Sequence, residues 1–250
     1  MNGTGLGMLL GLSIAGLGVA DAAQQGRDEA VLMLESAIRS GGGAEHLERF
    51  PALTWRGRAT VHAGGREIQI EGWWRLVPPD RAVVETREVG RGESSLRRLI
   101  LSGDRGWTER EAAQAQALAP EFTAHERDQF YLYYLMRFVP LRSPDFQLVS
   151  LGVDASGSQG IRVSRAGRRD VDLYFDAAKR LVRVVTRLTD PGTGKEVVEE
   201  LRCSGVLEAR GVRWPKRIAI TWDGLPYFDL ELTEFRPMRR LDESLFKPAK

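Results

Sequence analysis

The residue types that most often carry catalysis or bind metals are sparse and scattered in this chain. Its three histidines, His46, His62 and His125, lie far apart, and His125-Glu126 lacks the second histidine that completes a zinc-protease helix. We expect these histidines to be solvated or to cap helices. The chain contains no Gly-x-Ser-x-Gly nucleophile elbow and no phosphate-cradling glycine loop. The sequence therefore predicts no enzymatic activity, no metal and no cofactor.

Three aspartates near one another, Asp170, Asp172 and Asp176, raise the question of cation binding. Asp170 and Asp172 flank Val171 along an expected strand, so they should face solvent while the valine faces the core. Asp176 begins a turn, a position that aspartate commonly takes. These positions favour a solvated strand and a turn over a cation site.

Cys203 is the one cysteine of the chain, which excludes an internal disulfide and any metal site built from several thiolates. It lies inside an apolar strand that we expect from Val197 to Leu207. A cysteine in such a place usually behaves as a small buried hydrophobe. We therefore predict a buried, unreactive thiol.

The distribution of charge argues against nucleic acid as a partner. The chain has 36 basic and 34 acidic residues, a formal net charge of +2, and no block of either sign. A nucleic-acid-binding face needs clustered Lys and Arg side chains. The 250 residues, 42% of them hydrophobic, suffice for one large β domain or two ordinary ones. No break in composition separates two domains, so we predict one.

The amino terminus predicts export. Leu6 to Val19 is an apolar run too short to cross a bilayer comfortably, and Ala20-Asp21-Ala22 fits a small-residue cleavage site. We predict a signal peptide over residues 1–22 and a mature domain over residues 23–250. Because no Lys or Arg precedes the apolar run, a retained amino-terminal anchor is the alternative. No cysteine follows the cleavage site, so the mature protein should not be lipid-anchored there.

Two sets of alternating apolar runs predict two antiparallel meanders. Along each run, apolar and polar side chains point to opposite faces, which gives every strand one apolar and one wet face. Asp223-Gly224, between the last two strands, is a strong tight-hairpin signal. The two meanders together provide roughly ten strands, enough for one sheet that curls. The expected strands are 53–63, 67–76, 81–88, 96–101, a short one around Trp107, 146–153, 161–164, 171–175, 181–188, 197–207, 212–222 and 227–235.

Helical patterns precede and separate the meanders. Arg27 to Ser40 carries one apolar stripe and ends at a run of three glycines, and a short helical turn is expected from Ala44 to Phe50. Pro120 to Phe138 is apolar or aromatic nearly all round in its later part, so it must be enclosed on several sides. We predict that this helix lies in the mouth of the curved sheet. Its tyrosines 131, 133 and 134 carry phenols that prefer a wet end, as at a cavity rim.

The second half of the chain carries a recognisable pattern. It comprises Asp172-Leu173-Tyr174-Phe175-Asp176 through Leu181-Val182-Arg183-Val184, Asp190-Pro191 to Lys195-Glu196, Gly211-Val212-Arg213-Trp214-Pro215-Lys216-Arg217-Ile218, and Leu241-Asp242-Glu243-Ser244-Leu245-Phe246. With the order of helix, meander, inserted helix and second meander, this pattern resembles the LolA/LolB-like periplasmic outer-membrane lipoprotein-sorting proteins from Arg27 to Phe246. Neither Arg56 nor Arg58 matches the lid arginine of that family.

The resemblance implies a mainly β, α+β fold: one strongly curved antiparallel sheet forming a half-barrel, covered by an amino-terminal helix and the inserted aromatic helix. It also implies a periplasmic, non-catalytic carrier whose concave apolar face holds lipid or lipoprotein acyl chains. Its further partners would be inner- and outer-membrane envelope proteins, and we expect a monomer.

The apolar side chains expected on the concave face are the candidate ligand-binding residues. An acyl chain of about fifteen methylenes gains on the order of 12 kcal/mol gross on leaving water, which suffices for capture without a polar anchor. The alternative is that these residues pack as an ordinary core in an envelope sensor or scaffold that binds another protein, for which Trp73 on the polar face is a candidate contact. The candidates are Trp55, Val61, Ile70, Trp74, Phe122, Phe130, Tyr133, Tyr134, Leu173, Phe175, Val184, Ile220, Trp222, Phe228 and Leu230.

Overall fold

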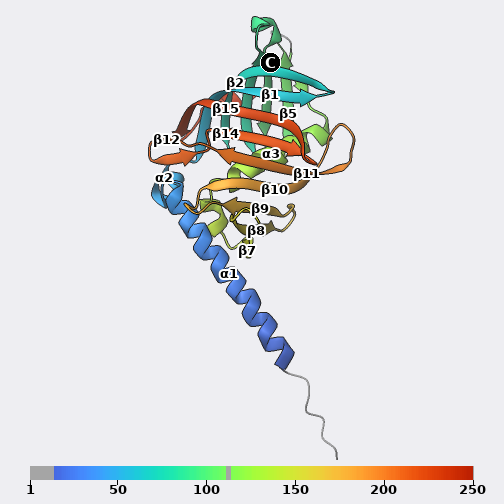
Figure 1. Ribbon diagram of the computed structural model, residues 1–250. Coiled ribbons are helices and arrows are strands. Elements are labelled where there is room, and N and C mark those ends of the chain that lie inside the picture. Colours follow the sequence, from blue (N-terminus) through green and yellow to red (C-terminus); the bar gives the residue numbers. More distant parts are fainter. Residues whose placement is uncertain (1–13, 111–113, 250) are drawn as a thin grey trace, which may run out of the picture.

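The chain folds around one curved antiparallel sheet (Figure 1). The structure is a computed structural model and describes residues 14–110 and 114–249. The helices are α1 (Ile14–Ser40), α2 (Ala44–Arg49) and α3 (Pro120–Leu135). The strands are β1 (Ala52–Ala63), β2 (Arg66–Val77), β3 (Arg81–Glu88), β4 (Arg97–Ser102), β5 (Arg105–Arg110), β6 (Gln116–Ala117), β7 (Phe146–Val153), β8 (Gln159–Arg165), β9 (Val171–Phe175), β10 (Leu181–Thr189), β11 (Glu196–Ser204), β12 (Leu207–Ala209), β13 (Val212–Trp214), β14 (Arg217–Trp222) and β15 (Leu225–Met238).

The two predicted meanders join into a single sheet. Within the described ranges the order is β6-β5-β4-β3-β2-β1-β15-β14-β11-β10-β9-β8-β7, 13 strands in all. The first and last long strands meet at its centre, where Trp55 of β1 lies opposite Phe235 of β15. β6 and β7 form the two edges, so the sheet curves without closing. The prediction of one curved half-barrel sheet is confirmed.

A pair of glycines lets the sheet bend between its central strands. Gly57 of β1 lies opposite Gly72 of β2. A Cβ added to Gly57 would lie 2.6 Å from the carbonyl oxygen of Glu231, and one added to Gly72 would lie 2.7 Å from that of Glu85. The β1–β15 register also shifts beside Gly57, as at a bulge. Glycines and bulges are the usual means by which sheets acquire tight curvature.

Helix α3 lies in the hollow of the sheet, as its apolar circumference predicted. It contacts β4 and β5 on one limb of the sheet and β10 on the other, and Figure 1 shows it behind β14 and β11. Its residues Phe130, Leu132 and Leu135 are buried. The helix ends at Leu135, three residues before the predicted end, because Phe138 adopts a φ of 64° that no right-handed helix can contain.

Helix α1 is longer in the structure than the predicted segment Arg27 to Ser40. It runs from Ile14 and projects beyond the sheet (Figure 1). Its carboxyl-terminal half packs Leu34 and Ile38 into the core beside β7. Residues 1–13 of the predicted signal peptide lie outside the described residues, so cleavage after Ala22 stays a prediction. No described helix combines the length and hydropathy that a membrane crossing requires.

Two predicted strands are divided in the structure. The expected strand 212–222 breaks at Pro215, which lacks the N–H that a continuous ladder needs, and becomes β13 and β14. The expected strand 197–207 ends at Ser204, and Leu207 begins β12 instead. β12 and β13 pair as a small separate hairpin. This hairpin packs beside α2, where His46 lies under Gly211.

Candidate functional site

The centre of the concave face is filled by aromatic side chains. Trp55 packs edge-on against Tyr133 of α3, with ring centroids 5.3 Å apart, and stacks on Trp214 at 5.9 Å. Trp214 in turn stacks on Phe235 at 5.9 Å. All four rings are buried. We call Trp55, Tyr133, Trp214 and Phe235 the aromatic block. Its rings pack α3 and β13 against the central strands β1 and β15.

Most of the residues predicted to form a cavity wall lie in this packed core. Nine are buried: Trp55, Trp74, Phe130, Tyr133, Leu173, Phe175, Val184, Ile220 and Leu230. Val61, Ile70, Tyr134, Trp222 and Phe228 are half-buried. Phe122, on the first turn of α3, is 43% exposed and stands apart from the wall. Contact of any of these residues with a ligand therefore stays a prediction.

Two expectations about polar side chains are wrong. Tyr131 and Tyr133 do not form a wet rim, because both are buried, and burial raises the pKa of the Tyr133 phenol. His125 is neither solvated nor a helix cap. It is buried with its ring edge-on to Trp222, at 5.5 Å between centroids, and desolvation lowers the pKa of its imidazole. Packing of α3 against the sheet thus encloses groups that the sequence alone would leave in water.

A cavity opens where the aromatic block ends. It has a volume of about 430 Å³, opens to solvent, and lies between the ends of α1 and α3 and the strands β10, β11 and β13. We call it the end pocket. Ligand pockets typically measure roughly 300–1,000 Å³. The residues that line it are Ser40, Gly41, Met136, Phe138, Asp176, Lys179, Arg180, Leu181, Val182, Cys203, Ser204, Gly205, Val206, Arg213, Trp214 and Pro215.

The floor of the end pocket is apolar and buried. Met136, Phe138, Cys203 and Trp214 are each less than a tenth exposed. Cys203 is buried, as predicted, and burial raises the pKa of its thiol to about 12. None of the candidate wall residues lines this pocket, although Phe175 packs behind its floor against Phe138, with ring centroids 5.7 Å apart.

A strained turn aims Phe138 at the end pocket. The N–H of Val139 donates to the carbonyl oxygen of Arg137 at 2.7 Å, which makes Phe138 the centre of a γ-turn with φ at 64°. A bulky residue in this conformation is strained, by about 1–3 kcal/mol, and such strain concentrates at functional sites. The turn converts the end of α3 into one side of the pocket.

A buried arginine fixes the same end of α3 to the neighbouring helix. Arg137 is 7% exposed, and its Nη2 donates to the carbonyl oxygens of Leu47 and Phe50, the latter at 3.3 Å. Burial lowers the pKa of the Arg137 guanidinium. These two carbonyls lie at the carboxyl-terminal end of α2. The contact therefore fixes the distance between the end of α2 and the end of α3.

The mouth of the end pocket is polar and held by backbone contacts. The hydroxyl of Ser40 donates to the carbonyl oxygen of Ala178 at 3.1 Å, which joins the end of α1 to the β9–β10 turn. The backbone N–H of Arg213 donates to the carbonyl oxygen of Gly41 at 2.9 Å, which joins α1 to β13. The mouth is thus assembled from three segments far apart in the sequence.

Two of the three aspartates considered for cation binding form ion pairs with arginines. Asp172 pairs with Arg162 at 2.7 Å on the outer face of the sheet, and Asp176 pairs with Arg180 at 2.7 Å across the β9–β10 turn. Among the described residues no group of three or more His, Cys, Asp or Glu is arranged to hold a metal ion. Asp172 and Asp176 thus serve a strand and a turn.

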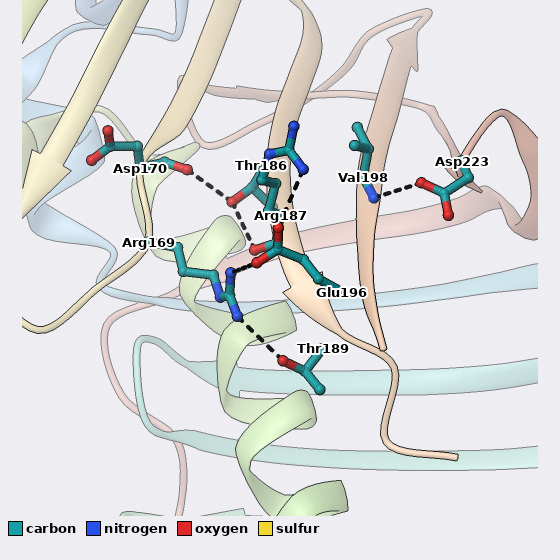
Figure 2. A network of polar contacts seen from close by, with 8 residues as sticks. All are labelled: Arg169, Asp170, Thr186, Arg187, Thr189, Glu196, Val198 and Asp223. Carbon is teal, nitrogen blue, oxygen red and sulfur yellow. Dashed lines mark hydrogen bonds and ion pairs between the residues drawn. The ribbon is translucent and has the colours of Figure 1, made fainter. Parts of the chain in front are cut away.

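The opposite end of the β10–β11 hairpin is closed by charged contacts (Figure 2). Arg169 and Arg187 both donate to the carboxylate of Glu196, the latter at 3.2 Å, and Arg169 also donates to the hydroxyl of Thr189 at 3.2 Å. These residues tie the loop end of the hairpin to the segment before β9.

The sequence reading missed a buried carboxylate on the concave face. Glu199 of β11 is fully buried, and its Oε2 accepts from Nε2 of Gln129 at 2.6 Å and from Nε1 of Trp222 at 2.8 Å. Burial raises the pKa of Glu199 to about 7, and that of Glu126 on α3 likewise to about 7. Strand alternation could have found Glu199, because it shares a face with Cys203.

The fold places the chain among known structures. No family model matches the sequence, and no curated protein matches it. Several solved structures share the architecture, including the following three. A domain assigned to an outer membrane lipoprotein-sorting protein from Vibrio parahaemolyticus matches with a TM-score of 0.56 at 11% identity, over 88% of this chain and 97% of that chain. A LolA superfamily protein from Nitrosomonas europaea matches at 0.53 and 12% identity, over 87% and 97%.

The third is a DUF1329 family protein from Desulfovibrio piger, with a TM-score of 0.57 at 9% identity, over 87% of this chain and 97% of that chain. At these identities the likeness concerns the fold. The chain has the LolA-like half-barrel fold, which confirms the architecture that the sequence pattern implied.

Proposed function

We propose that this protein is a periplasmic, non-catalytic carrier that binds lipid or lipoprotein acyl chains for sorting or transport towards the outer membrane. One observation carries the proposal: the concave face of a LolA-like sheet retains an open pocket with a buried apolar floor. A structural relative bears a lipoprotein-sorting name, and the predicted export signal is consistent with the periplasm.

The end pocket can supply the required binding energy. Burial of about ten methylenes against its floor would contribute on the order of 8 kcal/mol gross, at about 0.8 kcal/mol for each methylene. Losses of ligand and side-chain freedom offset several kcal/mol of this gain. The balance favours a reversible affinity, which suits a carrier because its ligand must also leave.

Lipid recovery tests the proposal directly. Protein purified from the periplasm without detergent should release acyl-chain lipid on extraction, detected by mass spectrometry. Val206→Glu puts a carboxylate at the half-exposed rim of the pocket, and Leu225→Glu is a matched control at an exposed position outside the pocket. We expect lipid to be lost from Val206→Glu and retained by Leu225→Glu. Lipid-free wild-type protein that also binds no added amphiphile would contradict the carrier function.

The alternative, an envelope sensor or scaffold, is favoured by a different surface. On the outer face Trp73 lies between two guanidinium groups, 4.7 Å from that of Arg56 and 4.0 Å from that of Arg75, and borders a groove of about 650 Å³. Aromatic and arginine side chains are enriched at protein interfaces. Trp73→Ala should then abolish co-purification of an envelope protein, whereas the carrier function predicts that it leaves lipid content unchanged.

A further inference from the structure

We propose that the end pocket selects a single-chain amphiphile with an anionic headgroup, a carboxylate or a phosphate, which Lys179 binds at the mouth. This inference rests on the proposed function, since it assumes that the pocket takes an acyl chain. It adds the chemistry of the headgroup and the number of chains.

Among the described residues, the charges at the mouth leave Lys179 without a carboxylate partner. Arg180 pairs with Asp176 at 2.7 Å, and Arg213 pairs with Glu208 at 2.9 Å. In the part of the chain that the structure describes, the ammonium of Lys179 donates to the neutral amide oxygen of Gln159. A lysine ammonium has three donors, so at least two stay available to an anion.

The backbone presents Lys179 in a fixed position. Its N–H donates to the carbonyl oxygen of Asp176 at 2.9 Å, and its φ of 62° is that of a tight turn. The same turn is fastened to the end of α1 through the Ser40 hydroxyl and the carbonyl of Ala178. Lys179 itself is half-buried beside the apolar strand residue Leu181. A charge held at the border of an apolar cavity suits an amphiphile better than a neutral lipid.

The volume of the pocket suits one chain. A volume of about 430 Å³ lies near the lower end of the range for ligand pockets, roughly 300–1,000 Å³, which suits one chain better than two. The aromatic block prevents a second chain from passing deeper, because Trp214 belongs both to the floor and to the block.

Binding of probes with one chain length and different headgroups tests the inference. The probes are dodecanoate, dodecyl phosphate, dodecanol and dodecyltrimethylammonium below their micelle concentrations, with a diacyl phospholipid as the two-chain comparison. Dissociation constants are measured by calorimetry for the wild type, Lys179→Gln, Lys179→Glu and the control Lys195→Gln, an exposed lysine at the closed end of the hairpin.

We expect the dissociation constants of the two anionic probes to be at least about tenfold lower than that of dodecanol. Hydrogen bonds to charged groups are stronger than those between neutral groups. Lys179→Gln should remove most of this preference, Lys179→Glu should reverse it in favour of the ammonium probe, and Lys195→Gln should change neither. Unequal binding of carboxylate and phosphate would identify which anion is preferred.

Equal binding of all four single-chain probes, unchanged by Lys179→Gln, would overturn the headgroup assignment and leave the carrier function standing. Tighter binding of the diacyl lipid than of the single-chain anions would overturn the one-chain assignment. Absence of binding by every probe would overturn both this inference and the proposed function.

Discussion

The aromatic block and the end pocket lie on the same concave face, yet one is a solid core and the other is open. Both are lined by aromatic and aliphatic side chains, and Trp214 belongs to both. The difference is that α3 covers the block and ends at Leu135, before it reaches the pocket. The length of the enclosed helix therefore decides which part of the hollow is filled. The composition of the lining side chains does not decide it, because the two regions are lined alike.

The largest expected effect comes from introducing charge on the filled side. Phe175 is fully buried, so Phe175→Arg should lower the free energy of unfolding by about 4 kcal/mol or more, through the lost aromatic ring and a buried charge. Val206→Arg, at a rim position that is 43% exposed, should change it by less than about 1 kcal/mol. Urea denaturation of both variants checks this. A stable, folded Phe175→Arg would mean that the floor of the pocket is not packed.

Loosening the end of α3 should shift the boundary between the two regions. Arg137→Met removes the guanidinium that binds the carbonyls of Leu47 and Phe50, and we expect a loss of about 2–3 kcal/mol because these buried acceptors lose their charged donor. The exposed Arg66→Met is the control. If Arg137 sets the boundary, the ratio of the affinity for longer acyl chains to the affinity for dodecanoate should be higher in Arg137→Met than in the wild type. An unchanged chain-length preference would show that Arg137 does not determine how far the pocket extends.

The buried carboxylates on the filled side should make stability depend on pH. The pKa of Glu199 is raised from 4.5 to about 7 in the folded state, so the folded protein holds this proton more tightly than the unfolded chain. Stability from this group is full below pH 4.5 and is lost as pH rises through about 7. The wild type should therefore lose on the order of 2 kcal/mol between pH about 5 and about 8 from this source.

Glu199→Gln should flatten that part of the profile, because the amide cannot ionise. The comparison is made between the two proteins at each pH, since Asp229 and other paired carboxylates, whose pKa values are lowered, oppose the trend at acid pH. Parallel profiles for the wild type and Glu199→Gln would show that Glu199 is not desolvated in the folded protein.

The smallest expected effect is a difference in stability between two substitutions of Phe138, in the strained turn beside the pocket. Phe138→Ala and Phe138→Gly both remove the ring, but only glycine relieves a φ of 64°. Phe138→Gly should therefore be more stable than Phe138→Ala by about 1 kcal/mol, the reverse of the usual order. Denaturation midpoints of the pair measure this difference. Greater stability of the alanine variant would contradict the turn geometry.

The strands and the enclosed helix could be predicted because each depends on a local pattern. Alternation gave the strand faces, and the Asp223-Gly224 hairpin is present with φ values of 48° and 80°. The all-round apolar character of α3 predicted its enclosure between the two limbs of the sheet. These features depend on residues within one turn or one strand of each other.

The end pocket could not be predicted because its walls meet only in the folded chain. Ser40 comes from α1, Phe138 comes from the segment that follows α3, and Cys203 comes from β11. No local pattern signals that these segments end at one place. The preference of a phenol for water predicts a wet rim of tyrosines, but packing of α3 against the sheet outweighs it for Tyr131 and Tyr133.

Photoaffinity mapping tests the central claim most directly. A dodecanoate analogue with a diazirine at the end of its chain is bound, irradiated, and located by peptide mass spectrometry, with unlabelled dodecanoate as competitor. The structure predicts cross-links that unlabelled dodecanoate reduces, on one or more of the floor residues Met136, Phe138, Cys203 and Trp214. Cross-links confined to the outer face of the sheet, or cross-links that the competitor does not reduce, would contradict the claim that the end pocket holds a hydrocarbon chain.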